Sequence, residues 1–316
     1  MAKVNTVLGP INTKDLGFTL AHEHLITAFH GAIKEFPELF MPNVLQYVVA
    51  GLKRTKAAGV DTVVDMTTVD LGRDADFMKE ASKRSGMNIV AVTGWWLDVP
   101  RFINGSSGSV NAERMADLFA KEVDKGIGDT GVKAGIIKAA SDVDGITPPL
   151  EMMLRAAAKA HLKTGVPLVI HSYHPGQVAR LQIEILKSEG VNLKHVKVDH
   201  ANDTTDIEYL TWILDQGCYL GLDRYPGRNT SSMSRTKTMK TLIDAGYIDK
   251  LCPSHDCSLG YILPPGKTTE EYEVGNPHRY LYMKKVVFKM LKDMDVPDAK
   301  INRLCVTGPR NFFEGQ

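Results

Sequence analysis

The sequence contains no apolar run that approaches the roughly 18–20 residues needed to span a membrane. It also has almost no net charge, because 38 basic residues are balanced by 37 acidic ones, without a basic stripe or a charged tail. These absences argue against a membrane-spanning protein and against nucleic acid or a membrane surface as a partner. The first five residues include no apolar signal-peptide core, so we expect a cytoplasmic protein.

Cysteine is also scarce, and the 316 residues include only Cys218, Cys252, Cys257 and Cys305. Four cysteines cannot form the scaffold of a disulfide-rich protein, and they indicate a reducing compartment. The C-x4-C spacing of Cys252 and Cys257 is a weak metal signal, so we interpret both as core residues or as residues that support a site. The chain also shows no internal repeat and no low-complexity segment.

What the sequence does contain is a repeated pair of patterns, a short apolar run followed by an amphipathic helix. The first strand ends at His24, and the others are predicted at 60–66, 88–94, 134–138, 166–171, 196–200, 219–223 and 250–256. Helices are predicted at 42–59, 73–85, 111–125, 147–165, 176–189, 205–216, 232–245 and 279–293, before a short terminal helix that ends near Arg303. Eight strand–helix units predict one (β/α)8 TIM-barrel domain over residues 1–316.

A doubly wound open sheet is the alternative fold. It is disfavoured because no Gly-x-Gly-x-x-Gly motif follows the first strand. Pro167 and Pro253 fit barrel strands poorly because proline cannot donate to the ladder, but both are expected early in their strands, where the cost is smallest. The stretch 257–277 is too long for an ordinary connection and is predicted to be a loop that covers the substrate.

Side chains of the kinds that bind metals stand where five of the predicted strands end. In a (β/α)8 barrel these ends meet at one mouth, where the active site lies. The six residues are His22, His24, Lys138, His171, His200 and Asp256. Six ligands are too many for one tetrahedral ion, and they suit two divalent ions about 3.5–4 Å apart that share a bridging water or hydroxide.

The spacing also suggests how the ligands divide. His22 and His24 alternate along a strand and so face the same side, and with Asp256 they are expected to hold the more buried ion. His171 and His200 are expected to hold the outer ion. Lys138 can contribute as a carbamate formed with carbon dioxide, or it can stay unmodified and bind an anionic group of the substrate; the spacing does not choose between these roles.

Together these residues resemble the amidohydrolase superfamily, and more narrowly its phosphotriesterase family, particularly the phosphotriesterase-like lactonases. The resemblance runs from about Val4 to Phe313 and fills all six ligand positions. It also includes Asp203 and Asp206 after the sixth strand. Three stretches also resemble the corresponding segments of that family: GIGDTG at 126–131, GLDRY at 221–225 and SHDC at 254–257.

The resemblance implies that Lys138 is carboxylated and bridges two divalent ions, most often zinc, with cobalt, manganese or iron as substitutes. A bridging hydroxide would attack a lactone carbonyl or a phosphotriester phosphorus, and Asp256 would carry its proton away. His255 could extend that relay, but strand alternation turns it away from Asp256 and favours a structural role. Members of the family pair as homodimers; the candidate interface, which could equally be ordinary loop packing, is Phe36, Leu39, Phe40 and Met41.

The substrate pocket is predicted from residues that follow strands three and seven. Trp95 and Trp96 follow strand three, and one is expected to wall the substrate while the other packs in the core. Arg224 and Tyr225 follow strand seven and are expected to contact the leaving group or the ring, or to form a solvated loop pair. Strand seven matches the lactonases over more residues, whereas the Trp-Trp pair is closer to the triesterases.

The sequence therefore predicts a metal-dependent hydrolase that opens lactones, such as N-acyl-homoserine lactones, with secondary activity on organophosphate triesters. The alternatives are a dedicated phosphotriesterase, or a hydrolase of another ester or of a phosphorylated sugar lactone. A barrel that binds a small ligand without turnover is disfavoured, because catalysis is the best explanation for a second ion and a bridge.

Overall fold

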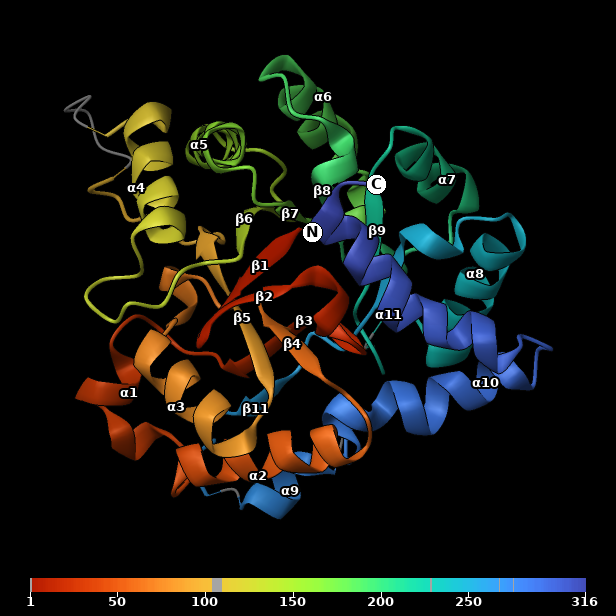
Figure 1. Cartoon of the computed structure of the whole chain (residues 1–316), viewed down its shortest axis with the longest axis horizontal. Helices are drawn as coiled ribbons and strands as arrows, with labels where there is room; N and C mark the ends of the chain where they lie inside the picture. The colour runs from red at the N-terminus through yellow and green to blue at the C-terminus, as the bar shows by residue number, and fades with distance from the viewer. Residues whose placement is uncertain (1, 104–109, 228, 267, 275) are drawn as a thin grey trace.

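The protein is a closed barrel of parallel strands, seen in the computed structural model, which describes residues 2–103, 110–227, 229–266, 268–274 and 276–316 (Figure 1). Its strands follow one another in chain order, and every pair in the sheet is parallel. They are β3 (Thr19–Ile26), β4 (Thr62–Asp65), β5 (Asn88–Gly94), β6 (Ile136–Ser141), β7 (Leu168–Ser172), β8 (Val196–Asp199), β9 (Tyr219–Leu222) and β10 (Leu251–Pro253). The predicted TIM barrel is confirmed.

The barrel closes where the chain that leaves β10 meets β3. Asp256 donates its backbone N–H to the carbonyl of His22 at 3.1 Å, and His24 donates its N–H to the carbonyl of Cys257 at 3.1 Å. The short strand β11 (Ser258–Gly260) then continues along β3 in parallel register. This seam joins the first predicted ligands to the last one through backbone hydrogen bonds.

Helices cover the outside of the barrel, and apolar side chains fill the space between the two layers. Side chains of Asp74, Asn111, Asp206 and Ser231 cap four of these helices by accepting a backbone N–H in the first turn. The main helices are α2 (Val44–Ala57), α3 (Ala75–Ser85), α4 (Ala112–Asp124), α5 (Pro148–Thr164), α6 (Ala179–Ser188), α7 (Ile207–Asp215), α8 (Ser232–Asp244), α10 (Phe288–Lys292) and α11 (Asp298–Glu314). In the part of the chain that the structure describes, no helix is long and apolar enough to cross a membrane.

Four features differ from the prediction. A hairpin of β1 (Lys3–Thr6) and β2 (Gly9–Asn12), too short to show a periodic pattern, covers the N-terminal end of the barrel, where Val7 donates its N–H to the carbonyl of Ile89 at 2.8 Å. The stretch 257–277 is not simply a loop, because it holds β11 and α9 (Thr269–Glu273). The segment predicted as a helix over 279–293 begins with a 3-10 turn (Arg279–Leu281) and a π-helix (Met283–Val287) before α10. Pro253 ends its strand instead of standing early in it.

The terminal helix α11 also runs to Glu314 instead of ending near Arg303, although Pro309 lies inside it. Its buried face explains why. Gly308 lies so close to β10 that an added Cβ would stand 2.5 Å from the carbonyl oxygen of Leu251. Leu304 and Phe312 are also buried, so packing outweighs the poor helix propensity of glycine and proline.

Candidate metal centre

The barrel mouth brings the predicted ligands together. Five of the six are 5% exposed or less, and the side chain of Asp256 is 21% exposed. Three donor atoms from β3, the end of β8 and the chain after β10 lie within 4.8 Å of one another and belong to His22, His200 and Asp256. The site therefore has the side-chain chemistry and the spacing of a cation site that opens toward solvent at Asp256.

One half of the site consists of two imidazoles that face a single carboxylate. The Nε2 atoms of His22 and His24 lie 3.3 and 3.2 Å from Oδ1 of Asp256. Nδ1 of His22 is hydrogen-bonded to Oδ2 of Asp199 at 2.6 Å, and Nδ1 of His24 to the hydroxyl of Thr67 at 2.8 Å. When Nδ1 donates to Asp199, a neutral His22 carries a lone pair on Nε2, and that buried atom has no hydrogen-bond partner among the described residues. A cation between Nε2 and Asp256 satisfies both groups.

The other half is a pair of histidines in direct contact. Nδ1 of His171 lies 2.7 Å from Nε2 of His200. The outer ring nitrogens contact carboxylates, with Nε2 of His171 3.2 Å from Asp142 and Nδ1 of His200 2.9 Å from Asp223. This chain of contacts needs three hydrogens on four ring nitrogens, one more than two neutral imidazoles carry. A metal ion that takes the two inner nitrogens would replace the extra proton, so the donor set fits a divalent cation.

The electrostatics of the site agree with this. Burial opposes the protonation of His22, but the carboxylates of Asp199 and Asp256 outweigh it and raise the pKa of His22 to about 10. Burial also disfavours the charged form of Asp256, yet the charge of His22 and its hydrogen bond hold the pKa of that carboxyl well below its usual range. Without a metal, this half of the site therefore attracts a positive charge strongly.

Lys138 lies inside the barrel on β6, 2% exposed, with Nζ 3.3 Å from the carbonyl oxygen of Met66. Burial lowers the pKa of its ammonium group. β6 continues beyond the predicted strand to Ser141, so Lys138 stands in the middle of the strand and not at its end. A lysine with a depressed pKa has more of the neutral amine that reacts with carbon dioxide.

A buried glutamate between the two β3 histidines holds the seam of the barrel. The carboxylate of Glu23 accepts hydrogen bonds from the hydroxyl of Ser254 at 2.7 Å and from the backbone N–H groups of His255 and Cys257 at 3.0 and 3.3 Å. It also contacts Nδ1 of His255, whose Nε2 accepts the backbone N–H of Met283 at 3.0 Å. The two ring nitrogens of His255 are thus both engaged on the side of Glu23 and Met283, which agrees with the structural role expected for it.

Arg224 borders the cavity after β9 and contacts two carboxylates. Its Nε donates to Oδ2 of Asp256 at 3.1 Å, and its Nη1 donates to Oδ2 of Asp203 at 2.5 Å. Burial opposes the charge on Arg224, but these two carboxylates raise the pKa of its guanidinium. Arg224 is thus held against a predicted ligand, and a third of its side chain remains exposed to the mouth.

A cavity of about 820 Å³ opens beside Asp256. Among the described residues, its lining is mostly polar and includes both signs of charge: Asp203, Arg224, Tyr225, Pro226, Gly227, Asn229, Arg235, His255, Asp256, Cys257, Ser258, Glu273, Asn276 and Arg279. Asn276 and Arg279 come from the end of the predicted covering segment and the turn after it. This segment thus borders the cavity, as a covering segment would.

The other predicted pocket residues divide into two groups. The ring of Trp96 lies edge-on to His171 with centroids 6.3 Å apart, so it walls the centre, whereas Trp95 packs partly against the core. Asp70 fixes the Trp96 segment by accepting its backbone N–H at 3.1 Å. Tyr225 borders the cavity but is itself 1% exposed, and its hydroxyl faces Thr236 at 3.4 Å.

Sequence reasoning did not single out the carboxylates that orient the histidines, which are Asp142, Asp199 and Asp223, nor the seam residue Glu23. Three of the four stand inside or beside predicted motifs. Asp199 precedes His200, Asp223 precedes Arg224, and Glu23 separates His22 from His24. An acidic residue next to a predicted ligand was the available signal, because metal-binding histidines usually donate their second nitrogen to a carboxylate or a carbonyl.

A (β/α)8 barrel that gathers histidines and an aspartate at its mouth above a buried lysine defines a metal-dependent hydrolase. Residues 2–313 match the Phosphotriesterase family, and the chain belongs to that family, whose members are binuclear metal enzymes. A "Phosphotriesterase homology protein" of Mycobacterium tuberculosis is 36% identical over all of this chain and 99% of its own length. An "Aryldialkylphosphatase" of Saccharolobus solfataricus is 35% identical over 96% of both chains. The solved structure of the phosphotriesterase from Mycobacterium tuberculosis matches with a TM-score of 0.91 and 34% identity, over 99% of this chain and 98% of that one.

Proposed function

We propose that this hydrolase opens lactones and hydrolyses organophosphate triesters as a secondary activity. The observation that carries the proposal is the position of the polar 820 Å³ cavity, which begins at Asp256, the one predicted ligand whose side chain is substantially exposed. A substrate in this cavity presents its carbonyl or phosphoryl group to the predicted ligands while its remaining atoms contact the wall.

The proposed ligands are His22, His24 and Asp256 for one ion and His171 and His200 for the other, with carboxylated Lys138 shared between them. Zinc is the first expectation, with cobalt, manganese or iron as substitutes, because imidazole and carboxylate donors suit all of these ions. A bound pair of such ions supplies activated water near neutral pH and polarises the bond under attack.

The chain itself supplies the remaining functions. Asp256 is placed to accept a proton at the mouth, because its side chain is the exposed member of the set and has a second oxygen that contacts Arg224. Arg224 holds that carboxylate in place and extends the polar surface toward Asp203. Trp96 covers the His171 side and excludes water there.

The lining of the cavity also bears on the substrate. A long acyl chain gains free energy by contact with apolar walls. The described lining is mostly polar and carries the ion pairs Arg224–Asp203 and Arg279–Glu273, whose contact with water an acyl chain would remove without replacing it. We therefore propose that compact lactones with polar substituents are better substrates than long-chain N-acyl-homoserine lactones. A dedicated triesterase is the second candidate, supported by Trp96 beside His171 and by the similarity to an aryldialkylphosphatase.

The deciding measurement is kcat/KM of the zinc-loaded protein on three substrates: a hydroxylated γ-lactone, a long-chain N-acyl-homoserine lactone and paraoxon. Rates are compared with those of Asp256→Asn, which keeps the shape of the side chain and removes its charge. Preference for the polar lactone by at least about tenfold in the parent, together with loss of turnover of all three substrates in Asp256→Asn, supports the proposal. A preference for paraoxon makes the triesterase primary, and a lack of turnover of all three substrates by protein with two bound ions refutes both.

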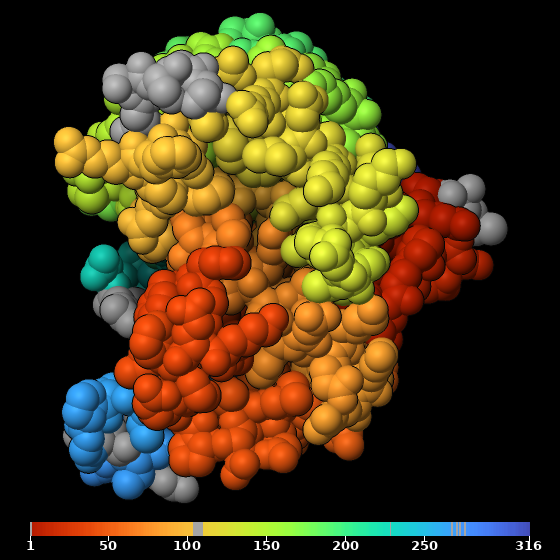
Figure 2. All heavy atoms as spheres, turned by 90° about the vertical axis from the view of Figure 1, so that its left-hand side faces the viewer, coloured from red at the N-terminus to blue at the C-terminus, as the bar shows by residue number. Residues whose placement is uncertain are grey.

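We also propose a homodimer that forms through the face around α1 (Ala32–Glu35). Phe29, Phe36, Leu39 and Ile262 are between 37% and 47% exposed there, and the rings of Phe29 and Phe36 contact each other at a tilt of 56° with centroids 5.8 Å apart. Phe40 and Met41, which the sequence suggested for the interface, are instead buried within the chain. Both views place α9 beside α2 at the edge of this face (Figures 1 and 2).

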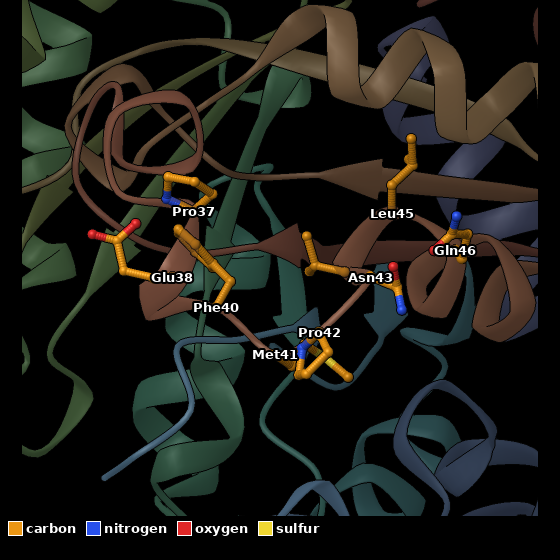
Figure 3. Close-up of a pocket in the computed structure, with 9 residues that line it drawn as sticks. Pro37, Glu38, Phe40, Met41, Pro42, Asn43, Leu45 and Gln46 are labelled. Carbon is orange, nitrogen blue, oxygen red and sulfur yellow. The ribbon is translucent and has the colours of Figure 1, made fainter.

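The same segment of the chain carries a hollow of about 510 Å³. Figure 3 shows the residues that line it. Its lining comes from residues 37–46 and includes Pro37, Phe40, Met41 and Pro42. Because a twofold interface uses the same patch on both copies, an apolar projection beside an apolar hollow can be self-complementary. The occupant we propose is therefore a second copy of this chain.

A further inference from the structure

Beneath the candidate centre, β8 sends two charged side chains into the barrel. Lys197 and Asp199 are two residues apart on a strand, so both face the same side, and they are 1% and 0% exposed. Nζ of Lys197 forms an ion pair with Oδ1 of Asp199. The other oxygen of Asp199 contacts Nδ1 of His22 at 2.6 Å. The pair is thus connected to the centre through one histidine.

A second carboxylate competes for the same imidazole. Oδ2 of Asp223 lies 3.3 Å from Nδ1 of His22, but it has no hydrogen-bond partner among the described residues, because the single hydrogen on Nδ1 goes to Asp199. Asp223 instead binds His200 through its other oxygen, at 3.0 Å from the backbone nitrogen and 2.9 Å from Nδ1. Asp199 therefore orients His22, and Asp223 orients His200.

The barrel makes room for this arrangement at one glycine. A Cβ at Gly221 would stand 2.2 Å from Oδ1 of Asp199 and 2.5 Å from Oδ2 of Asp223, so any larger residue would push both carboxylates away from the histidines. Among the described residues, Asp199 forms ion pairs with two side chains, His22 and Lys197. Lys197 is therefore the one positive charge on Asp199 that does not come from the histidine itself. Because the lysine takes Oδ1, the carboxylate cannot rotate, and Oδ2 stays aimed at the imidazole.

We propose that Lys197 and Asp199 form a buried positioning pair that holds His22 with Nε2 directed at the more buried metal ion and so sets the affinity for that ion. Neither residue touches the cavity, so neither contacts substrate. The proposal rests on the proposed role of His22 as a ligand. Groups that orient metal-binding histidines contribute on the order of 10- to 100-fold to metal affinity when they are removed.

The test measures metal binding directly, without substrate. Apparent Kd values for zinc are obtained by competition with a chromophoric chelator, and the number of bound ions by elemental analysis, for the parent, Asp199→Asn, Lys197→Met and the double variant. We expect Asp199→Asn to weaken the tighter zinc by roughly 10- to 100-fold. Lys197→Met should weaken it less, and the double variant should be no weaker than Asp199→Asn alone, because Lys197 acts through Asp199.

Two controls make the outcome decisive. Glu189→Gln removes another ion-paired carboxylate, which contacts Arg155 and Lys159 in the connection from α6 to β8, at the opposite end of that strand from His200, and it should not change the zinc affinity. His22→Asn should lose the tighter ion. If His22→Asn keeps both ions, the assignment of ligands is wrong; if it loses one while Asp199→Asn binds like the parent, the positioning pair is wrong. Independent, additive losses from Lys197→Met and Asp199→Asn would also overturn the proposal.

Discussion

At the scale of single residues, each histidine of the centre depends on a partner that fixes its second nitrogen. His24 has Thr67, His22 has Asp199, His200 has Asp223 and His171 has Asp142. Such partners choose the tautomer and leave the inner nitrogen free for a cation. The candidate ligand that differs from the histidines is Lys138: among the described residues its ammonium group has only the Met66 carbonyl within hydrogen-bond distance, and it needs a chemical change before it can bind a metal.

Lys138→Ala should remove the shared ligand. We expect the variant to lose most of its bound metal and at least about 100-fold in kcat/KM, since metal activation is worth several kcal/mol. Elemental analysis and kinetics measure both quantities, and Lys133→Ala, on the exposed chain just before β6, is the matched control. Two bound ions and parental activity in Lys138→Ala would contradict the bridging role.

A buried histidine outside the proposed ligand set predicts a dependence of stability on pH. His174 is 1% exposed, and burial lowers its pKa to about 4. Between pH 4 and about pH 6.5, the usual pKa of histidine, the unfolded chain binds a proton at His174 and the folded chain does not. The free energy of unfolding is therefore not reduced by His174 above about pH 6.5, and it falls as the pH drops below that value.

His174→Gln should reduce that dependence by up to about 3 kcal/mol across the interval, because glutamine does not titrate. The glutamine amide can still donate to the backbone oxygen of Asp199, which accepts from His174 at 2.8 Å. The measurement is urea unfolding of metal-free protein from pH 7 to pH 4.5, with His30→Gln as the control at an exposed position. If the free energy of unfolding depends on pH in the same way for the parent and for His174→Gln, burial does not prevent the protonation of His174.

At the scale of elements, the seam between β3 and the end of β10 is held by side chains more than by a long strand ladder. β10 has three residues, and the chain that follows it reaches β3 through two backbone hydrogen bonds and the carboxylate of Glu23. The same glutamate stands between two proposed ligands. The seam therefore sets the position of His22, His24 and Asp256 relative to one another.

Glu23→Gln should weaken the seam. An amide has one acceptor oxygen and presents its NH2 to donors that the carboxylate now satisfies, which leaves at least one buried N–H without a partner, at a cost of about 1–3 kcal/mol. Urea unfolding of metal-free protein measures this cost, and Glu208→Gln, at an exposed position of α7, is the control. A parental free energy of unfolding would mean that the backbone alone closes the barrel.

At the scale of the whole molecule, the proposed homodimer depends on the apolar face around α1. Leu39→Glu places a charge on that face, which costs free energy only if the face is buried against a second copy. We expect light scattering coupled to size exclusion to report a dimer for the parent and a monomer for Leu39→Glu. Leu118→Glu, on the exposed side of α4, should remain a dimer. A monomeric parent would contradict the interface.

The fold could be predicted from periodic patterns, and the meeting of the candidate ligand side chains in one barrel from residue types near the predicted strand ends. The orienting carboxylates could not, and the reason lies in two backbone angles. His200 and Asp256 have φ values of 66° and 51°, in the left-handed region that few residues other than glycine adopt. A strand that kept its alternation would point Asp199 and His200 to opposite faces, whereas this turn lets both reach the centre. Glu23 keeps the alternation of β3, which turns it away from His22 and His24 and toward His255.

The closure of the barrel by Glu23 and Ser254 joins residues 231 positions apart. A contact of such long range forms late in folding, because loop-closure entropy opposes it until the intervening strands have aligned. During synthesis, His22 and His24 emerge before nearly all of the chain, and Asp256 emerges near its end. The complete set of ligands therefore cannot exist until the last strand has joined the first, and tight metal binding becomes a property of the finished fold alone.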